Sequence, residues 1–181
     1  MTASVGALRL VFDTTCLSHF ARADRLDVLG DLLAGADSFL PHVVREEIRD
    51  GSNEYPELIR VLEVEWLRVV ALDSLDRLRR FTIWTGRVGA GSRNLGEASV
   101  LAVAEEFDAV ALIDERDATQ VGRSHGIDVH GTIWLLARAC REGKLTEVAA
   151  GNLLDDLVAT GMRLPCSGAD LPRYARTNGL L

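Results

Sequence analysis

Two apolar segments of the chain each end in an aspartate. Residues 8–12 (LRLVF) are followed by Asp13, and residues 109–113 (AVALI) are followed by Asp114. Each apolar run has the length of a buried strand, and a helix-like segment follows it. In an open parallel sheet, ligands bind beyond the carboxyl ends of the strands, at the point where the strand order reverses. If the two strands are neighbours at that point, both carboxylates face one crevice.

A glutamate on a short predicted helix is the third candidate. The segment PHVVREEIRDG (41–51) has an apolar side that includes Val44 and Ile48, and Glu47 adjoins it. Glu46 is turned about 100° away on a helix of 3.6 residues per turn. Glu47 is therefore the better candidate for an inward carboxylate, although an ordinary solvated helix face would also explain either glutamate.

The fourth candidate, Glu97, lies in the first turn of a predicted helix over NLGEASVLAVAEEF (94–107). Its spacing from Val100 and Leu101 puts it at the border of the apolar face, where it can project toward the strand ends. A capping box with Asn94 as the N-cap is an equally good explanation of the same residue.

A cluster of four carboxylates needs a cation. Asp13, Glu47, Glu97 and Asp114 would disfavour one another's ionised forms if they lay together, because like charges repel. Oxygen ligands suit Mg²⁺ or Mn²⁺. Two such ions about 3.5–4 Å apart can activate water and stabilise the leaving oxygen in phosphodiester cleavage. The histidines and cysteines show none of the spacings typical of zinc sites, so the sequence favours metal held by oxygen.

The elements that would position these acids alternate between strands and helices. This alternation predicts an α/β fold with a central parallel sheet of about five strands and helices on both faces. The predicted strands are 8–12, 37–40, 66–71, 109–113 and 127–129. Helical patterns are clearest at 24–34 and 95–107, and two further helices are expected within 131–145 and 146–162.

The size and composition predict one domain in the cytoplasm. A chain of 181 residues with 48% hydrophobic residues supports one core, which we assign to a domain over 1–164 followed by a C-terminal tail over 165–181. No apolar stretch approaches the ~20 residues of a membrane span, and no membrane partner is expected. Cys16, Cys140 and Cys166 are too widely spaced for a disulfide framework and are expected to be free thiols.

The charge distribution is uneven along the chain. The net charge of −7 argues against a uniformly basic surface that coats nucleic acid. The segment 77–93, however, contains five arginines and no acid, and it leads into the helix that carries Glu97. It is either a phosphate-binding patch with a flexible glycine-rich second half or a solvated surface. In the first case the RNA-binding residues are Arg77, Arg80, Arg87 and Arg93.

The order of these motifs resembles a known family. The sequence contains DTTCLSHF after the first strand, PHVVREE, LGEASVLA and LIDERDA, and then GTIWLLARACREGKL and LLDDLVATGMRL. Together they resemble the PIN-domain ribonucleases, in particular the VapC-like branch related to toxins. The resemblance spans nearly the whole chain.

The resemblance implies a three-layer PIN-like sandwich and a function. It implies Mg²⁺- or Mn²⁺-dependent hydrolysis of single-stranded RNA to 5′-phosphate and 3′-hydroxyl ends. It also implies a homodimer and an inhibitory antitoxin partner. The implied catalytic and metal-binding carboxylates are Asp13, Glu47, Glu97 and Asp114, with Asp117 as an accessory metal ligand.

Two other functions are compatible with parts of the pattern. A haloacid-dehalogenase-like phosphatase also begins with a strand that ends in an aspartate, but Thr15 stands where its second aspartate would be. A non-catalytic module with a PIN fold would need only the fold, and nothing would require it to keep four mutually repulsive acids.

Overall fold

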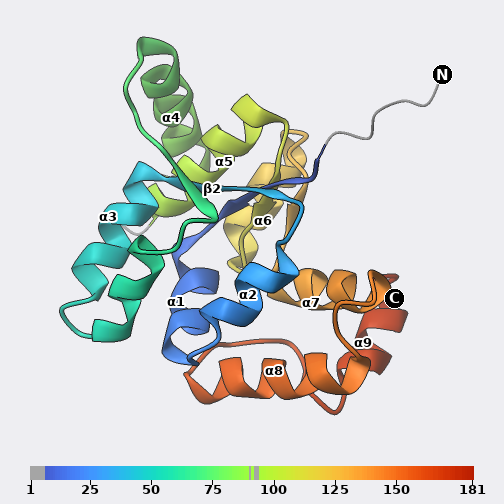
Figure 1. Ribbon diagram of the computed structural model, residues 1–181. Coiled ribbons are helices and arrows are strands. Elements are labelled where there is room, and N and C mark those ends of the chain that lie inside the picture. The colour runs from blue at the N-terminus through green and yellow to red at the C-terminus, as the bar shows by residue number, and fades with distance from the viewer. Residues whose placement is uncertain (1–6, 90, 92–93) are drawn as a thin grey trace.

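A parallel sheet forms the centre of the computed structural model, which describes residues 7–89, 91 and 94–181 (Figure 1). Each strand lies within about two residues of its predicted position. The strands are β1 (Arg9–Phe12), β2 (Asp37–Pro41), β3 (Leu67–Val70), β4 (Val110–Leu112) and β5 (Val129–His130). Their order across the sheet is β3-β2-β1-β4-β5, and every neighbouring pair is parallel.

The strand order reverses between β1 and β4. From β1 the chain moves to β2 and β3 on one side, and it then returns to place β4 on the other side of β1. Val11 of β1 pairs with Phe39 of β2 and with Ala111 of β4. The backbone N–H of Asp13 still donates to the carbonyl of Leu112 at 3.1 Å, one residue beyond β1. The two strands are therefore neighbours at the switch point, as the sequence analysis required.

Helices cover both faces and confirm the three-layer α/β sandwich. In Figure 1, α5 lies on one side of β2, and α1, α2 and α7 lie on the other. No helix in the described part of the chain is long and apolar enough to cross a membrane. The helices are α1 (Thr14–Arg22), α2 (Leu26–Leu32), α3 (His42–Gly51), a 3₁₀ helix (Pro56–Leu62), α4 (Leu75–Val88), α5 (Leu95–Phe107), α6 (Arg116–Ser124), α7 (Thr132–Arg141), α8 (Glu147–Ala159) and α9 (Leu171–Thr177).

Helix α5 is the central helix of its layer. It contacts β1, β2 and β4, and its small and aliphatic residues from Ala98 to Ala104 are all buried. Asp108 ends the helix in the left-handed conformation, with φ of 48°. This burial fixes the first turn of α5, and therefore Glu97, against the edge of the sheet.

Helix α4 includes residues that we expected in a flexible loop. It begins after the N-cap Ser74 and continues through Gly86 to Val88. Trp84 is fully buried, and its indole N–H donates to Glu105 of α5 at 3.1 Å. This anchor explains why the helix extends past the glycine. Figure 1 shows α4 standing out at the edge of the molecule.

The C-terminal segment contains a helix that the sequence analysis did not predict. Leu171 and Ala175 of α9 are buried, and α9 packs against α7 and α8. The N–H of Gly168 donates to Asp155 of α8 at 2.7 Å. At Gly151, a Cβ atom would lie 2.6 Å from the carbonyl oxygen of Gly168, so the segment crosses α8 in direct backbone contact. The tail is therefore folded onto the domain.

Candidate metal centre

Asp13 and Asp114 lie at the carboxyl ends of the neighbouring strands β1 and β4. Asp13 is buried and is the N-cap of α1, where its carboxylate accepts from the N–H of Thr15 at 3.3 Å. Asp114 accepts from the backbone N–H of Thr132 at 2.8 Å and from its hydroxyl at 2.7 Å. Both aspartates are thus fixed by the first turns of helices that begin at this edge of the sheet.

Glu47 joins the centre from α3, whereas Glu46 points away from it. The hydroxyl of Thr14 donates to Glu47, so the glutamate is tied to the residue after Asp13. Glu46 instead accepts from Arg45 at 3.0 Å and from Arg49 at 2.5 Å. These contacts place Glu47 beside Thr14 and pair Glu46 with arginines, and the role of Glu47 as a metal ligand stays a prediction.

Glu97 reaches the centre from the first turn of α5. The capping box with Asn94 is not formed, because the Asn94 side chain makes no cap bond and its amide donates to the carbonyl of Val88 at 3.3 Å. The charge of Glu97 acts directly on Asp13 and raises the pKa of that carboxyl. Glu97 is therefore an inward-facing acid.

Two glycines provide the space that these carboxylates occupy. A Cβ atom at Gly96 would lie 2.6 Å from Oε2 of Glu47, and one at Gly131 would lie 2.5 Å from Oδ1 of Asp114. Real Cβ atoms do not approach other heavy atoms so closely, so any side chain here would push the carboxylate aside. Gly96 and Gly131 are therefore needed to keep the carboxylates of Glu47 and Asp114 in their positions.

Burial raises the pKa of every carboxyl in the set, and repulsion by neighbouring carboxylates adds to this at Asp13 and Glu97. The pKa of Asp13 is raised from 3.8 to about 7, first by burial and then by the charge of Glu97, with a smaller contribution from Glu47. Burial is also the main cause of the raised pKa of Glu47, Glu97 and Asp114, and Glu47 raises the pKa of Glu97 further. The ionised centre is electrostatically unfavourable without a cation.

The donor set fits a hard divalent cation. Among the described residues, the groups that lower these pKa values are hydroxyls and backbone N–H groups, not cationic side chains. Carboxylate oxygens with uncompensated charge are the ligands that Mg²⁺ and Mn²⁺ prefer. Within residues 7–89, 91 and 94–181, no three Asp, Glu, His or Cys side chains already lie close enough together to hold an ion. Thr14 and Thr132 hold two of the carboxylates where they stand.

Glu115 is an exposed acid whose charge reaches Glu97, and the sequence analysis did not single it out. Its carboxylate accepts from the N–H of Ala118 at 2.7 Å as the N-cap of α6, and its charge raises the pKa of Glu97. Asp117, the expected accessory ligand, is exposed on α6. The sequence signal that could have identified Glu115 is its position directly after Asp114. The metal-binding role of Asp117 stays a prediction.

Three arginines of the predicted RNA-binding patch, Arg77, Arg80 and Arg87, lie on α4, and two of them are paired with acids. Arg77 contacts Glu106 at 2.9 Å and Asp73 at 2.8 Å, and Arg80 lies 3.6 Å from Glu105. The guanidinium of Arg87 lies 4.6 Å above the ring of Trp84. Arg93 lies outside the described residues. Phosphate binding by this patch stays a prediction, and it would have to compete with the pairs at Arg77 and Arg80.

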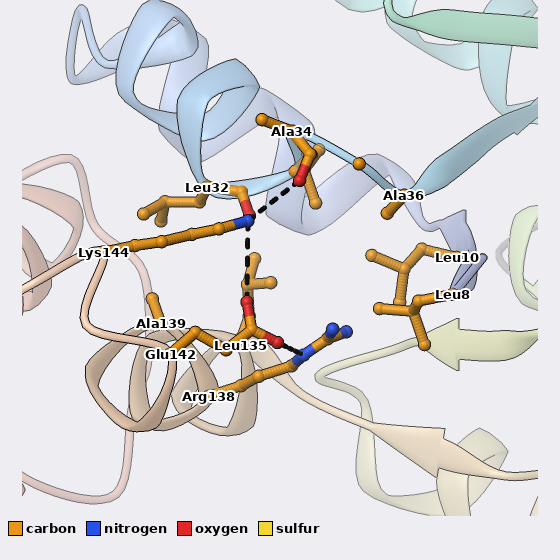
Figure 2. Close-up of a pocket in the computed structure, with 12 residues that line it drawn as sticks. Leu8, Leu10, Leu32, Ala34, Ala36, Leu135, Arg138, Ala139, Glu142 and Lys144 are labelled. Atoms are coloured by element: carbon orange, nitrogen blue, oxygen red, sulfur yellow. Dashed lines mark hydrogen bonds and ion pairs between the residues drawn. The ribbon is translucent and has the colours of Figure 1, made fainter. Parts of the chain in front are cut away.

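A small cavity of about 110 Å³ lies at the opposite, amino end of β1 (Figure 2). Lys144, the only lysine of the chain, donates there to the carbonyls of Leu32 at 2.7 Å and Ala34 at 3.0 Å. Arg138 pairs with Glu142 at 2.5 Å. Both charged side chains already have partners in the cavity wall, so their presence is explained by the structure without a bound ligand.

A family model described as DUF3368, a PIN domain, matches residues 9–168. No curated protein matches the chain. Among solved structures, a domain of a functionally unknown protein from Methanocaldococcus jannaschii DSM 2661 is 18% identical, with a TM-score of 0.46 over 69% of this chain and 91% of that one.

The chain belongs to the PIN-domain family. PIN domains are generally nucleases, and they generally use divalent metal ions. Membership therefore supports a hydrolase of phosphodiester bonds, and it confirms the family expected from the motifs. A phosphatase of the haloacid-dehalogenase type is not supported.

Proposed function

We propose that this protein is a Mg²⁺- or Mn²⁺-dependent endoribonuclease that cleaves single-stranded RNA. The observation that carries the proposal is the position of Asp13 and Asp114 at the carboxyl ends of the neighbouring strands β1 and β4, with Glu47 bound to Thr14 and the charges of Glu47 and Glu97 acting on Asp13. Burial raises the pKa of all four carboxyls, neighbouring carboxylates raise those of Asp13 and Glu97 further, and no cationic side chain among the described residues lowers any of them. Such a cluster is costly to keep unless it binds metal.

These four carboxylates would hold the metal, and their neighbours position them. When bound, divalent ions at such a centre supply activation of water and stabilisation of the leaving oxygen. The Thr14 hydroxyl orients Glu47, and Thr132 orients both oxygens of Asp114. The α1 N-terminus orients Asp13 and favours its ionised form. The chain thus fixes the carboxylates that metal and substrate would meet.

Cleavage of a labelled single-stranded RNA in Mg²⁺ or Mn²⁺ tests the proposal. Asp13→Asn and Asp114→Asn should each abolish cleavage. Glu46→Gln is a matched control, because Glu46 neighbours Glu47 on α3 but pairs with arginines outside the centre. It should cleave as the wild type does. Wild-type activity in either aspartate variant would refute the assignment.

A second pair of variants separates the two candidate accessory acids. Glu115→Gln should reduce cleavage, because Glu115 acts on Glu97, whereas Asp117→Asn should have a smaller effect if its exposed side chain lies outside the centre. A larger loss in Asp117→Asn would restore the role implied by the resemblance. Binding of RNA without cleavage by any protein form, in either metal, would favour a non-catalytic binding module.

We also propose a homodimer and a role as the toxin of a toxin–antitoxin pair. Leu75, Leu78 and Ile83 are exposed on α4 and offer an apolar surface for a second copy. The net charge of −7 suits an inhibitory antitoxin with a basic segment. Light scattering that shows a strict monomer at micromolar concentration would contradict the dimer. The toxin role would be contradicted if none of the proteins encoded by neighbouring genes relieved the toxicity.

Free cysteines fit a cytoplasmic location.

A further inference from the structure

A large cavity adjoins the acidic centre on the side of β5 and the C-terminal segment. Its volume is about 510 Å³, and Asp114 is part of its wall. The other walls come from α6, the start of α7, the segment before α9 and α9 itself. Pockets of 300–1,000 Å³ are the usual size of small-ligand sites, so the space accommodates a nucleotide.

Three arginines line this cavity, in contrast to the acidic charge of the whole chain. They are Arg116, Arg123 and Arg163. Arg123 is oriented by the carbonyl of Val129, to which Nε and Nη2 donate at 3.0 and 2.6 Å, so its charge is fixed without being neutralised. In the part of the chain that the structure describes, no carboxylate lies within ion-pair distance of any of the three arginines. These charges differ from those of Arg77 and Arg80 on α4, which face acids.

Aromatic rings complete the lining. His130 and Trp134 are stacked, with ring centroids 4.3 Å apart and ring planes 7° from parallel. Tyr174 joins them from α9 and is half-buried. Arginines that reach phosphate, combined with aromatic faces for bases, are the two components that proteins use to bind single-stranded nucleic acid.

We infer that this cavity holds a nucleotide of single-stranded RNA next to the phosphodiester that is cleaved. Arg116, Arg123 and Arg163 contact the backbone phosphates, and Tyr174 contacts the base. The shared wall residue Asp114 places the bound nucleotide directly beside the acidic centre. The inference rests on the proposed function and adds to it the surface that holds the substrate.

The C-terminal segment would contribute to RNA binding, because it forms part of the cavity wall. Arg163, Leu164, Pro165 and Tyr174 form one wall of the cavity, and they reach it because α9 packs on α7 and α8. A protein ligand could also enter such a space. The arginine-rich and aromatic lining favours RNA, because the arginine fork matches phosphate geometry and any base offers a face for stacking.

Binding of a fluorescent ten-nucleotide single-stranded RNA, measured by anisotropy over a range of salt, tests the phosphate contacts. Measurements in EDTA and in Ca²⁺ keep binding separate from cleavage. The double variant Arg116→Ala/Arg163→Ala should bind more weakly, and its slope of log Kd against log salt should fall by about 1.4 if each arginine meets one phosphate. Arg25→Ala/Arg49→Ala removes the same charge from exposed ion pairs elsewhere and should keep the wild-type slope.

Two outcomes of this experiment would overturn the inference. In the first, Arg80→Ala/Arg87→Ala lowers the slope and the cavity variant does not, which would assign the phosphates to α4. In the second, the wild type binds no RNA in either condition, which would leave a protein segment as the occupant. If the wild type binds RNA through the cavity but never cleaves it, the proposed nuclease function fails while the binding site stands.

Substitutions at Tyr174 test the base contact separately from charge. Tyr174→Leu keeps apolar bulk in α9 but removes the ring, and it should weaken binding about 5- to 160-fold, which is the ~1–3 kcal/mol of stacking one base. Tyr174→Phe keeps the ring and should bind as the wild type does. Circular dichroism checks that both variants fold. Equal affinity for the leucine and phenylalanine variants would overturn the base contact.

Discussion

Replacing Asp13 by asparagine should stabilise the metal-free protein at alkaline pH. The pKa of Asp13 is raised from 3.8 to about 7 in the folded chain, mainly because the carboxyl is buried. The folded state therefore binds this proton more tightly than the unfolded state, and the free energy of unfolding falls as pH rises between these two values. The difference corresponds to about 4 kcal/mol above pH 7. Asparagine keeps the N-cap of α1 and carries no charge, so it avoids this loss.

Thermal unfolding followed by circular dichroism in EDTA measures this effect. For a chain of this length, about 4 kcal/mol corresponds to a rise in Tm of about 8–16 °C for Asp13→Asn at pH 8. The gain should shrink as pH falls and vanish below about pH 3, where Asp13 is protonated in both states. Glu46→Gln, outside the acidic centre, should show no such pH-dependent gain. If Asp13→Asn is no more stable than the wild type at pH 8, the electrostatic account of the site is wrong.

Three further measurements address the metal and the scaffold. Mn²⁺ at about 100 times its Kd should stabilise the wild type by about 2.7 kcal/mol and Asp114→Asn by much less; an active protein whose Tm ignores Mn²⁺ would contradict the metal centre. Gly96→Ala should weaken Mn²⁺ binding in calorimetry, because its Cβ would lie 2.6 Å from Oε2 of Glu47, and unchanged affinity would remove Glu47 from the ligand set. Lys144→Met should lower stability to urea by about 1–3 kcal/mol while cleavage is retained, and a loss of cleavage would show that the amino-end cavity matters for function.

The sheet and the two strand-end aspartates were predictable because their signals are local. A short apolar run that ends in Asp13 or Asp114 identifies both the strand and the carboxylate beyond it, and parallel pairing then brings the two together. The same logic identified Glu47, since helical periodicity separates it from Glu46. At these positions the local pattern and the tertiary contacts agree.

The remaining features depend on contacts that no local pattern encodes. Gly86 marks a loop by propensity, but burial of Trp84 against α5 keeps the chain helical there. Helix α9 forms because Leu171 and Ala175 find a surface on α7 and α8. The run of arginines predicted a positive surface without acidic partners. The fold neutralises part of this charge, because Asp73 in the loop before α4 and Glu106 on α5 pair with Arg77.

The switch point between β1 and β4 also governs when the acidic centre can exist. During synthesis Asp114 is made about 100 residues after Asp13, its neighbour across the sheet. At about 5–20 residues per second, the two are separated by about 5–20 seconds of synthesis. During that time β1 can pair with β2, but its other edge stays open until β4 arrives. A nascent chain that lacks β4 therefore carries no assembled centre, and the step that adds β4 to the sheet is also the step that brings Asp114 beside Asp13.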